Sequence, residues 1–250
     1  MTKDFNNISG GLFSSALSDD DFEQLYLALR QKEGRIYKDE EVSLLPYISN
    51  THPQYDEWKI RTRSFKKLLD YIKHRPVGLS ILEVGCGNGW LAARLAAAKA
   101  IVTGIDINKT ELEQAERVFH KQAGLNFKYG ELRNGVLGDE KFAMIIFAAS
   151  VQYFSPLKEI IDQAIKHLEP GGEIHILDSR FYSQDELMAA RQRTKDYYDS
   201  LGFPQMANHY YHHSMKALDQ YNYTILRDPY SWKNKLPGAK NPFYWVVLKN

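Results

Sequence analysis

Residues 81–90 read ILEVGCGNGW, so a short apolar run leads into glycines at positions 85, 87 and 89. This pattern is typical of a buried strand that ends in a glycine turn and continues as a helix. Glycine permits a positive φ and lets a ligand approach the backbone closely. In open parallel sheets, ligands bind beyond the carboxyl ends of the strands, near the switch in strand order. The segment therefore predicts an α/β fold with a ligand site at this turn.

Short apolar runs alternate with helical patterns on the carboxyl side of the turn. The predicted strands are LSILEV (79–84), IVTGID (101–106), LNFKY (125–129), FAMIIFAA (142–149), GEIHILD (172–178), YTILR (223–227) and FYWVVLK (243–249). Helices are predicted over 90–99, over 109–123, and from an N-cap at Ser155 with a first-turn Pro156 to about Leu168. We expect a doubly wound, mostly parallel seven-stranded sheet with helices on both faces and an antiparallel last strand.

Two helical regions accompany this core. Helices predicted over 18–31, with a capping pattern at Ser18 and Asp21, and over 55–74 precede the first strand. Helical patterns over 184–199 and 205–220 follow the fifth strand. We therefore divide the chain into an N-terminal helical cap, residues 1–78, and a main domain, residues 79–250, with a lid-like insertion at about 180–220.

Three residues around the turn indicate the ligand. Asp106 ends the second strand, at the interval expected for a carboxylate that accepts hydrogen bonds from ribose hydroxyls. A dinucleotide site needs a third glycine where Trp90 stands, so that pyrophosphate reaches the helix N-terminus. A carboxylate at Glu83 would repel pyrophosphate and favour a ligand with an ammonium and a sulfonium. S-Adenosylmethionine carries both charges and a ribose.

With these residues the chain resembles the class I S-adenosylmethionine-dependent methyltransferases (methyltransferase type 11/25-like). The first motif of that family, an acidic residue, an apolar residue and G-x-G-x-G, reads EVGCGNG at 83–89. FAMIIFAASVQYF (142–154) is similar to its fourth strand and turn, and LEPGGEIHILD (168–178) to the entry into its fifth strand. The resemblance covers about 79–178 and implies a Rossmann-like enzyme that methylates an acceptor by in-line displacement and releases S-adenosylhomocysteine.

The resemblance also implies a set of cofactor-binding residues. Asp106 matches the ribose-binding acid, and Glu131 stands where the family commonly has an Asp that bonds the adenine amino group. The expected cofactor contacts come from Glu83, Gly85, Cys86, Gly87, Asn88, Gly89, Trp90, Asp106, Ile107, Glu131, Leu132 and Ala148.

A general base is harder to assign. The family's frequent Asp in the fourth strand is Ala143 here, and its frequent His in the following turn is Gln152. Tyr153, His209 and His212 are the candidate bases, with Tyr26 as a further pocket group; a base is needed only if the acceptor starts protonated. A catalytically silent cofactor-binding or regulatory module is therefore an alternative, and an NAD-dependent oxidoreductase, disfavoured by Glu83 and Trp90, is a third.

Several patterns have a structural as well as a functional explanation. His209 and His213 have the spacing of metal ligands on one helix face, but no third ligand accompanies them and we expect no metal. Cys86 has no evident partner base and is not expected to act as a nucleophile. Arg61 and its neighbours fit a solvated helix face. Seven aromatic residues either wall a substrate pocket or pack against the sheet: Phe181, Tyr182, Tyr197, Tyr198, Phe203, Tyr210 and Tyr211.

The composition narrows the class of partner. Lys and Arg number 32 against 31 for Asp and Glu, and the net charge of +1 attracts neither nucleic acid nor a membrane surface as a class. No apolar run is long enough to span a bilayer. The single cysteine excludes an intrachain disulfide and suits a reducing compartment. We expect a cytoplasmic enzyme with a small-molecule substrate and no nucleic-acid or membrane partner.

Overall fold

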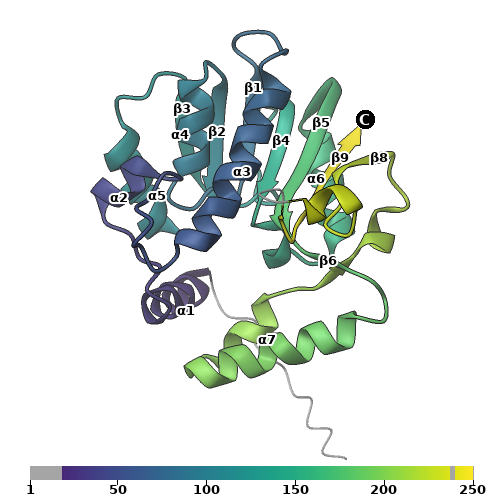
Figure 1. Cartoon of the computed structure of the whole chain (residues 1–250). Coiled ribbons are helices and arrows are strands. Elements are labelled where there is room, and N and C mark those ends of the chain that lie inside the picture. The colour runs from purple at the N-terminus through teal and green to yellow at the C-terminus, as the bar shows by residue number, and fades with distance from the viewer. Residues whose placement is uncertain (1–18, 237–239, 250) are drawn as a thin grey trace, which may run out of the picture.

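The computed structural model describes residues 19–236 and 240–249. Within these ranges, seven strands form one sheet in the order β3-β2-β1-β4-β5-β9-β8 (Figure 1). The neighbouring pairs from β3 to β5 are parallel, whereas β9 is antiparallel to β5 and to β8. The predicted mostly parallel seven-stranded sheet is confirmed. Its strands are β1 (Ser80–Val84), β2 (Ile101–Asp106), β3 (Leu125–Tyr129), β4 (Phe142–Ala148), β5 (Leu168–Ser179), β8 (Tyr223–Arg227) and β9 (Tyr244–Lys249).

Helices cover both faces of the sheet, as expected for strands that are apolar on both sides. Successive side chains of β4 illustrate this, because Ile145 and Phe147 face one layer while Met144 and Ile146 face the other. The first layer contains α6 (Leu157–Lys166). The second contains α2 (Asp39–Leu44), α3 (Tyr55–Ile72), α4 (Trp90–Ala97) and α5 (Lys109–Phe119).

A third, smaller cluster lies beyond the carboxyl ends of the strands. There α1 (Asp19–Lys32) and α7 (Leu187–Leu201) lie near each other at one end of the sheet (Figure 1). Leu29 of α1 packs with Tyr198 of α7 and with Met206, all three nearly or fully buried. Segments separated by more than a hundred residues in sequence thus share one apolar cluster at the carboxyl ends of the strands.

Some sequence predictions differ from the structure. The helix predicted over 205–220 is wrong: short 3-10 segments flank β7 (His213–Ser214), whose backbone pairs with β6 (Phe181–Tyr182). Such tertiary pairing overrides a helical side-chain pattern. Pro156, rather than Ser155, is the N-cap of α6. The capping pattern at Ser18 lies outside the described residues. No helix in the described ranges combines the length and the apolar character that crossing a bilayer requires.

Gly89 offers a test of the packing behind the turn. It has a φ of 70°, and a Cβ there would lie 2.4 Å from Phe127 Cζ and 2.8 Å from Ala115 Cβ. Gly89→Ala should therefore lower the free energy of unfolding by about 2–4 kcal/mol, from left-handed backbone strain plus overpacking. Gly135→Ala is the matched control, because φ is 69° there but nothing lies within 4 Å of the added Cβ. Urea denaturation should show the smaller loss for Gly135→Ala; equal losses would refute the packing argument.

Candidate functional site

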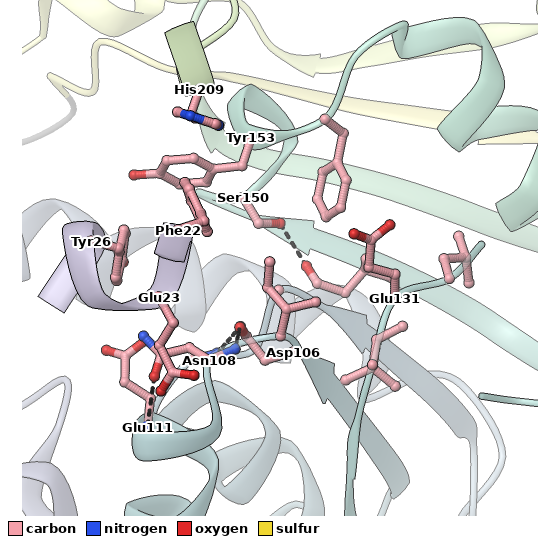
Figure 2. A pocket seen from close by; sticks show the side chains of 18 of the residues that line it. Phe22, Glu23, Tyr26, Asp106, Asn108, Glu111, Glu131, Ser150, Tyr153 and His209 are labelled. Atoms are coloured by element: carbon pink, nitrogen blue, oxygen red, sulfur yellow. Dashed lines mark hydrogen bonds between the residues drawn. The ribbon is translucent and has the colours of Figure 1, made fainter. Parts of the chain in front are cut away.

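A cavity of about 260 Å³ opens at the carboxyl ends of β1, β2 and β4, beneath α1 (Figure 2). It lies where strand order reverses between β1 and β4, the position that open α/β sheets use for ligands. Its lining residues come from α1, the glycine turn, the start of α5 and the segments after β3 and β4. They are Phe22, Glu23, Tyr26, Val84, Gly85, Gly87, Ile105, Asp106, Ile107, Asn108, Glu111, Gly130, Glu131, Leu132, Arg133, Ala149, Ser150, Tyr153, Phe154, Ser155, His209 and Tyr211.

The glycine turn is held against Asp106. Gly85 has a φ of 73° and Gly87 of 52°, and a Cβ on Gly85 would lie 2.6 Å from Ser150 Cβ. The Gly87 amide donates to Asp106 Oδ2 at 2.7 Å, and the Asn108 amide donates to Oδ1 at 2.8 Å. The Ile107 amide also bonds this group, and because a carboxylate has about four acceptor positions, Asp106 retains at least one for a ligand in the cavity.

Acidic side chains dominate the charge of this cavity. Glu23, Asp106, Glu111 and Glu131 line it together with one guanidinium, Arg133. Burial raises the pKa of Asp106, and hydrogen bonds from backbone amides oppose the shift. Burial and the neighbouring charge of Asp106 raise the pKa of Glu111 to about 7. Four carboxyl groups against one guanidinium give the cavity an excess of acidic groups, which favours a cationic ligand and disfavours a phosphate.

Helix α1 closes the cavity on the side away from the sheet (Figure 1). Glu23 is buried and accepts hydrogen bonds from Thr110 N at 2.9 Å and from Thr110 Oγ1 at 2.8 Å. A carboxylate at the first turn of α5 also interacts favourably with the helix dipole. Phe22 and Tyr26 of the same helix line the cavity (Figure 2). The ligand space is therefore completed by a helix that precedes the first strand by some fifty residues.

Two of the three candidate bases reach this cavity. Tyr153 and His209 line it, whereas His212 lies outside, 2.8 Å from Thr194 Oγ1 and in ring contact with Tyr182. Burial lowers the pKa of His209, so its imidazole is neutral at physiological pH, as a base requires. His213 is buried in β7 with its Nε2 3.1 Å from the Val151 carbonyl. No group of three or more metal-binding side chains occurs among the residues described.

The residues expected to contact a cofactor fall into two sets. Gly85, Gly87, Asp106, Ile107, Glu131 and Leu132 line the cavity. The others do not line it: Cys86 is buried, with its Sγ 2.8 Å from where a Gly104 Cβ would lie, and Trp90 packs edge-on against Trp58 and Phe65. The residues outside the lining are Glu83, Cys86, Asn88, Gly89, Trp90 and Ala148.

Glu83 belongs to the second set. It is 2% exposed, a backbone hydrogen bond from Ala92 reaches its carboxyl group, and Oε2 has no hydrogen-bond partner among the described residues. Burial raises the pKa of Glu83 to about 8, with the backbone bond opposing the shift. The side chain therefore sits neutral near the first turn of α4 rather than at the mouth of the cavity.

A second cavity, of about 420 Å³, adjoins the first, and both are lined by Ala149 and Tyr153. Ala149 directly follows β4 and has a φ of 54°, a strained conformation for a residue other than glycine. The remaining walls come from α1, α3, the end of β5 and α7. They are Arg30, Glu33, Arg35, Arg61, Gln152, Asp178, Ser179, Arg180, Tyr182, Ala190, Arg193, Thr194, Tyr197, Tyr198, Tyr210 and Phe243.

The chain is similar to known proteins both in sequence and in fold. Residues 81–172, which span the glycine turn, Asp106 and the strands up to the start of β5, match the family model described as "Methyltransferase domain". Over these residues the chain is similar to a methyltransferase domain.

Curated relatives of the domain are methyltransferases. The chain is 33% identical over 97 residues to a ubiquinone biosynthesis O-methyltransferase of Chelativorans sp., which covers 38% of this chain and 38% of that protein. It is 27% identical over 129 residues to the protein of the same name from Pseudomonas fluorescens, covering 47% and 55% respectively. The chain thus matches only about two fifths to just over half of the length of these relatives.

Solved structures share the fold over most of the chain. Magnesium protoporphyrin IX methyltransferase (ChlM) from Synechocystis PCC 6803 with bound SAH gives a TM-score of 0.60 at 16% identity, covering 93% of this chain and 97% of that one. The plantazolicin methyltransferase BpumL in complex with a triazolic desmethylPZN analog and SAH gives a TM-score of 0.55 at 16% identity, covering 93% and 98%. At these identities the likeness concerns the fold alone.

Sequence reasoning missed several lining residues. Glu111 lies in the first turn of the helix that follows Asp106, and this position close to the strand end could have indicated that it lines the cavity. Glu23 carried no signal, because its place depends on the docking of α1. Arg61 was assigned to a solvated helix face, yet it lines the second cavity and lies 2.9 Å from Glu57. Of the seven aromatic residues, Tyr182, Tyr197, Tyr198 and Tyr210 wall the second cavity, Tyr211 lines the first, and Phe181 and Phe203 pack in apolar clusters.

Glu83→Gln tests whether ionisation of this buried carboxyl group destabilises the fold. The pKa of Glu83 rises from 4.5 to about 8 on folding, so its contribution to stability is lost as the pH rises through that range. Glutamine keeps an acceptor for Ala92 and cannot ionise, so the variant should be more stable above about pH 8 by on the order of 2–4 kcal/mol. Urea denaturation across pH measures this against Glu113→Gln, whose side chain is 62% exposed. An unchanged pH profile for Glu83→Gln would contradict the buried, neutral state.

Proposed function

We propose that this protein is an S-adenosylmethionine-dependent methyltransferase that methylates a small-molecule acceptor by in-line displacement. The observation that carries the proposal is the acidic cavity beside the glycine turn, where Asp106 retains acceptor capacity for a ribose hydroxyl. Four carboxyl groups against one guanidinium suit a ligand that carries an ammonium and a sulfonium. The same charges oppose the pyrophosphate of NAD, so the oxidoreductase alternative is disfavoured by this cavity.

The lining residues divide the proposed cofactor between them. Gly85 and Gly87 admit it close to the backbone, and Asp106 accepts from the ribose. Glu131 and Leu132 lie after β3, where the adenine end is expected. Six residues do not line the cavity, and in this proposal they affect binding through the shape of the turn and of the neighbouring strand ends: Glu83, Cys86, Asn88, Gly89, Trp90 and Ala148.

When bound, S-adenosylmethionine supplies a methyl group already activated on sulfur. The protein's part is then alignment and exclusion of water, which contribute on the order of 7–11 kcal/mol without a dedicated base. Where the acceptor starts protonated, His209 or Tyr153 takes its proton, since both side chains reach the cavity. His209 is the stronger candidate because burial favours its neutral form.

The N-terminal region serves, in this proposal, as a cap with two parts. Helix α1 covers the cofactor cavity through Glu23, whereas α3 belongs to the layer that packs on the sheet. The division at residue 78 and the lid at about 180–220 remain our proposals. We also propose a cytoplasmic location without a nucleic-acid partner, since the single cysteine is buried and unpaired and the net charge is +1.

Calorimetric titration with S-adenosylmethionine and S-adenosylhomocysteine tests the cofactor assignment. Both should bind saturably, and Asp106→Ala should weaken them by about tenfold to a hundredfold, the loss expected for hydrogen bonds to a charged group. Asp139→Ala, in an exposed loop, is the control and should bind as the wild type. Thermal unfolding of each variant separates a folding defect from a binding defect. Tight binding of NAD with neither sulfur compound bound would overturn the assignment.

Glu23→Ala tests the cap. Loss of both Thr110 hydrogen bonds should loosen α1 and weaken S-adenosylhomocysteine binding by roughly tenfold, with little change in unfolding temperature. Glu113→Ala, on the exposed face of α5, provides the comparison. Deletion of residues 1–50 would test the cap less cleanly, because it would also remove Val42 and Leu45, which are fully buried in the core, and so destabilise the whole domain. Equal affinities for Glu23→Ala and wild type would exclude a capping role.

A further inference from the structure

The second cavity differs from the first in the sign of its charge. Five arginines and two carboxyl groups, Glu33 and Asp178, line it. If the first cavity holds the methyl donor, the acceptor must reach it through the shared wall at Ala149 and Tyr153. The charged groups of the second cavity then determine which acceptors bind.

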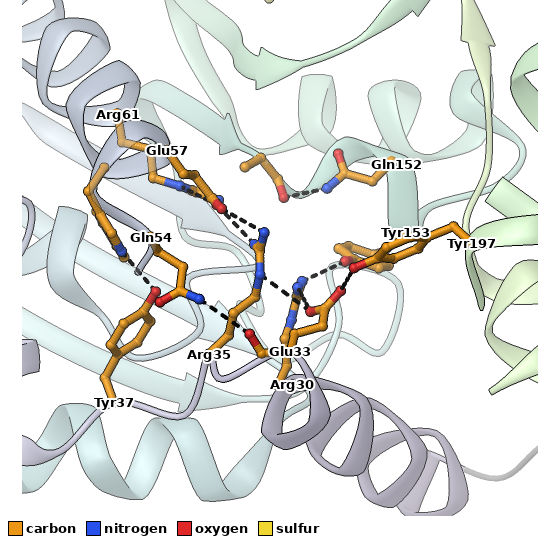
Figure 3. A network of polar contacts seen from close by, with 12 residues as sticks. Arg30, Glu33, Arg35, Tyr37, Gln54, Glu57, Arg61, Gln152, Tyr153 and Tyr197 are labelled. Atoms are coloured by element: carbon orange, nitrogen blue, oxygen red, sulfur yellow. Dashed lines mark hydrogen bonds and ion pairs between the residues drawn. The ribbon is translucent and has the colours of Figure 1, made fainter. Parts of the chain in front are cut away.

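Three of the five arginines are already paired with carboxylates (Figure 3). Arg30 pairs with Glu33 at 2.8 Å and donates to Tyr153 Oη at 2.9 Å. Arg35 pairs with Glu57 at 2.7 Å, and Arg61 with the same carboxylate at 2.9 Å. These pairs form a continuous network from α1 to α3, which shapes the cavity wall without leaving a guanidinium for a ligand.

Arg180 and Arg193 are different. Arg180 directly follows β5 and Arg193 lies on α7, so the strand end and the lid helix each contribute one cation to the cavity. Both arginines are exposed, and within the part of the chain that the structure describes neither side chain makes a hydrogen bond or an ion pair. A guanidinium presents a planar fork of donors that fits a carboxylate in bidentate geometry.

The rest of the cavity wall indicates what carries this carboxylate. Besides Tyr153, four tyrosines line the same cavity: Tyr182, Tyr197, Tyr198 and Tyr210. Aromatic side chains stack on or pack edge-on against planar rings, and arginine stacks on them too. The carboxyl groups of Glu33 and Asp178 in the same cavity oppose a doubly charged phosphate more strongly than a singly charged carboxylate.

We infer that the acceptor is an aromatic small molecule with a carboxylate, which Arg180 and Arg193 bind while its nucleophilic group points toward Ala149 and Tyr153. The acceptor role rests on the proposed function; the carboxylate site stands on the cavity's own charges. Cationic donor and anionic acceptor would then occupy adjoining cavities of opposite charge.

Matched probes test the carboxylate site. The wild type is titrated calorimetrically with 4-hydroxybenzoate and 6-hydroxy-2-naphthoate and with the corresponding neutral amides, in the presence and absence of S-adenosylhomocysteine. At least one acid should bind roughly tenfold or more tightly than its amide, the difference expected for charge-assisted hydrogen bonds. Arg180→Gln and Arg193→Gln should each abolish most of that preference. Arg191→Gln is the control, because this exposed arginine of α7 does not line the cavity.

Each outcome has a defined meaning. Equal binding of acid and amide, binding of neither, tighter binding of phenyl phosphate, or an acid preference that survives both arginine substitutions would overturn the carboxylate site. If Arg191→Gln reduced the preference for the acid to the same degree, the preference would come from the overall positive charge of this surface, and the carboxylate site would be refuted. Absence of S-adenosylhomocysteine binding with an intact, arginine-dependent acid preference would instead refute the proposed function while leaving the carboxylate site in place.

Discussion

Two short hydrogen bonds to one half-buried carboxylate organise the functional end of the sheet. Asp106 accepts the amide of Gly87 at 2.7 Å and that of Asn108 at 2.8 Å, which ties the turn after β1 to the start of α5. The bond to the turn requires the left-handed backbone of Gly87, and the bond to Asn108 positions the residue that caps α5 through Glu111 N. Both leave the carboxylate facing the cavity. Without this constraint, neither the glycine turn nor the acidic cluster around Glu111 would keep its place.

The placement of α1 and α7 depends on a contact of a different kind. Helices α1 and α7 bury little of the main core, and they meet each other through Leu29, Tyr198 and Met206. This small apolar cluster, with the pairs of Arg30 and Glu33 beside it, holds both helices above the strand ends. This cluster is smaller than those on the two faces of the sheet, so separation of α1 from α7 costs less than global unfolding. That ordering suits the two-ligand site proposed above.

Charge separates the two adjoining cavities. Carboxyl groups from α1, β2 and α5 converge on one side of Tyr153, and arginines from α1, α3, β5 and α7 converge on the other. Low local polarity strengthens such electrostatic preferences relative to water. The boundary falls at Ala149, where β4 ends in a strained backbone. Ligands of opposite charge would be oriented toward each other across this point, which is the arrangement that direct group transfer needs.

The sequence by itself determined the sheet, its helical layers and the half of the cofactor site that lies close to strand ends. Gly85, Gly87, Asp106 and Glu131 were predictable because each follows a recognisable strand at a short, regular interval. The sequence could not reveal that Glu83 and Trp90 do not line the cavity, since side-chain direction depends on what packs against β1. Tertiary structure alone decided the docking of Glu23 on Thr110, the non-helical path through His213 and the presence of Arg180 and Arg193 in one cavity wall. These depend on the docking of α1 and α7 and on strand pairing between distant segments, and such long-range contacts leave no periodic trace in the chain.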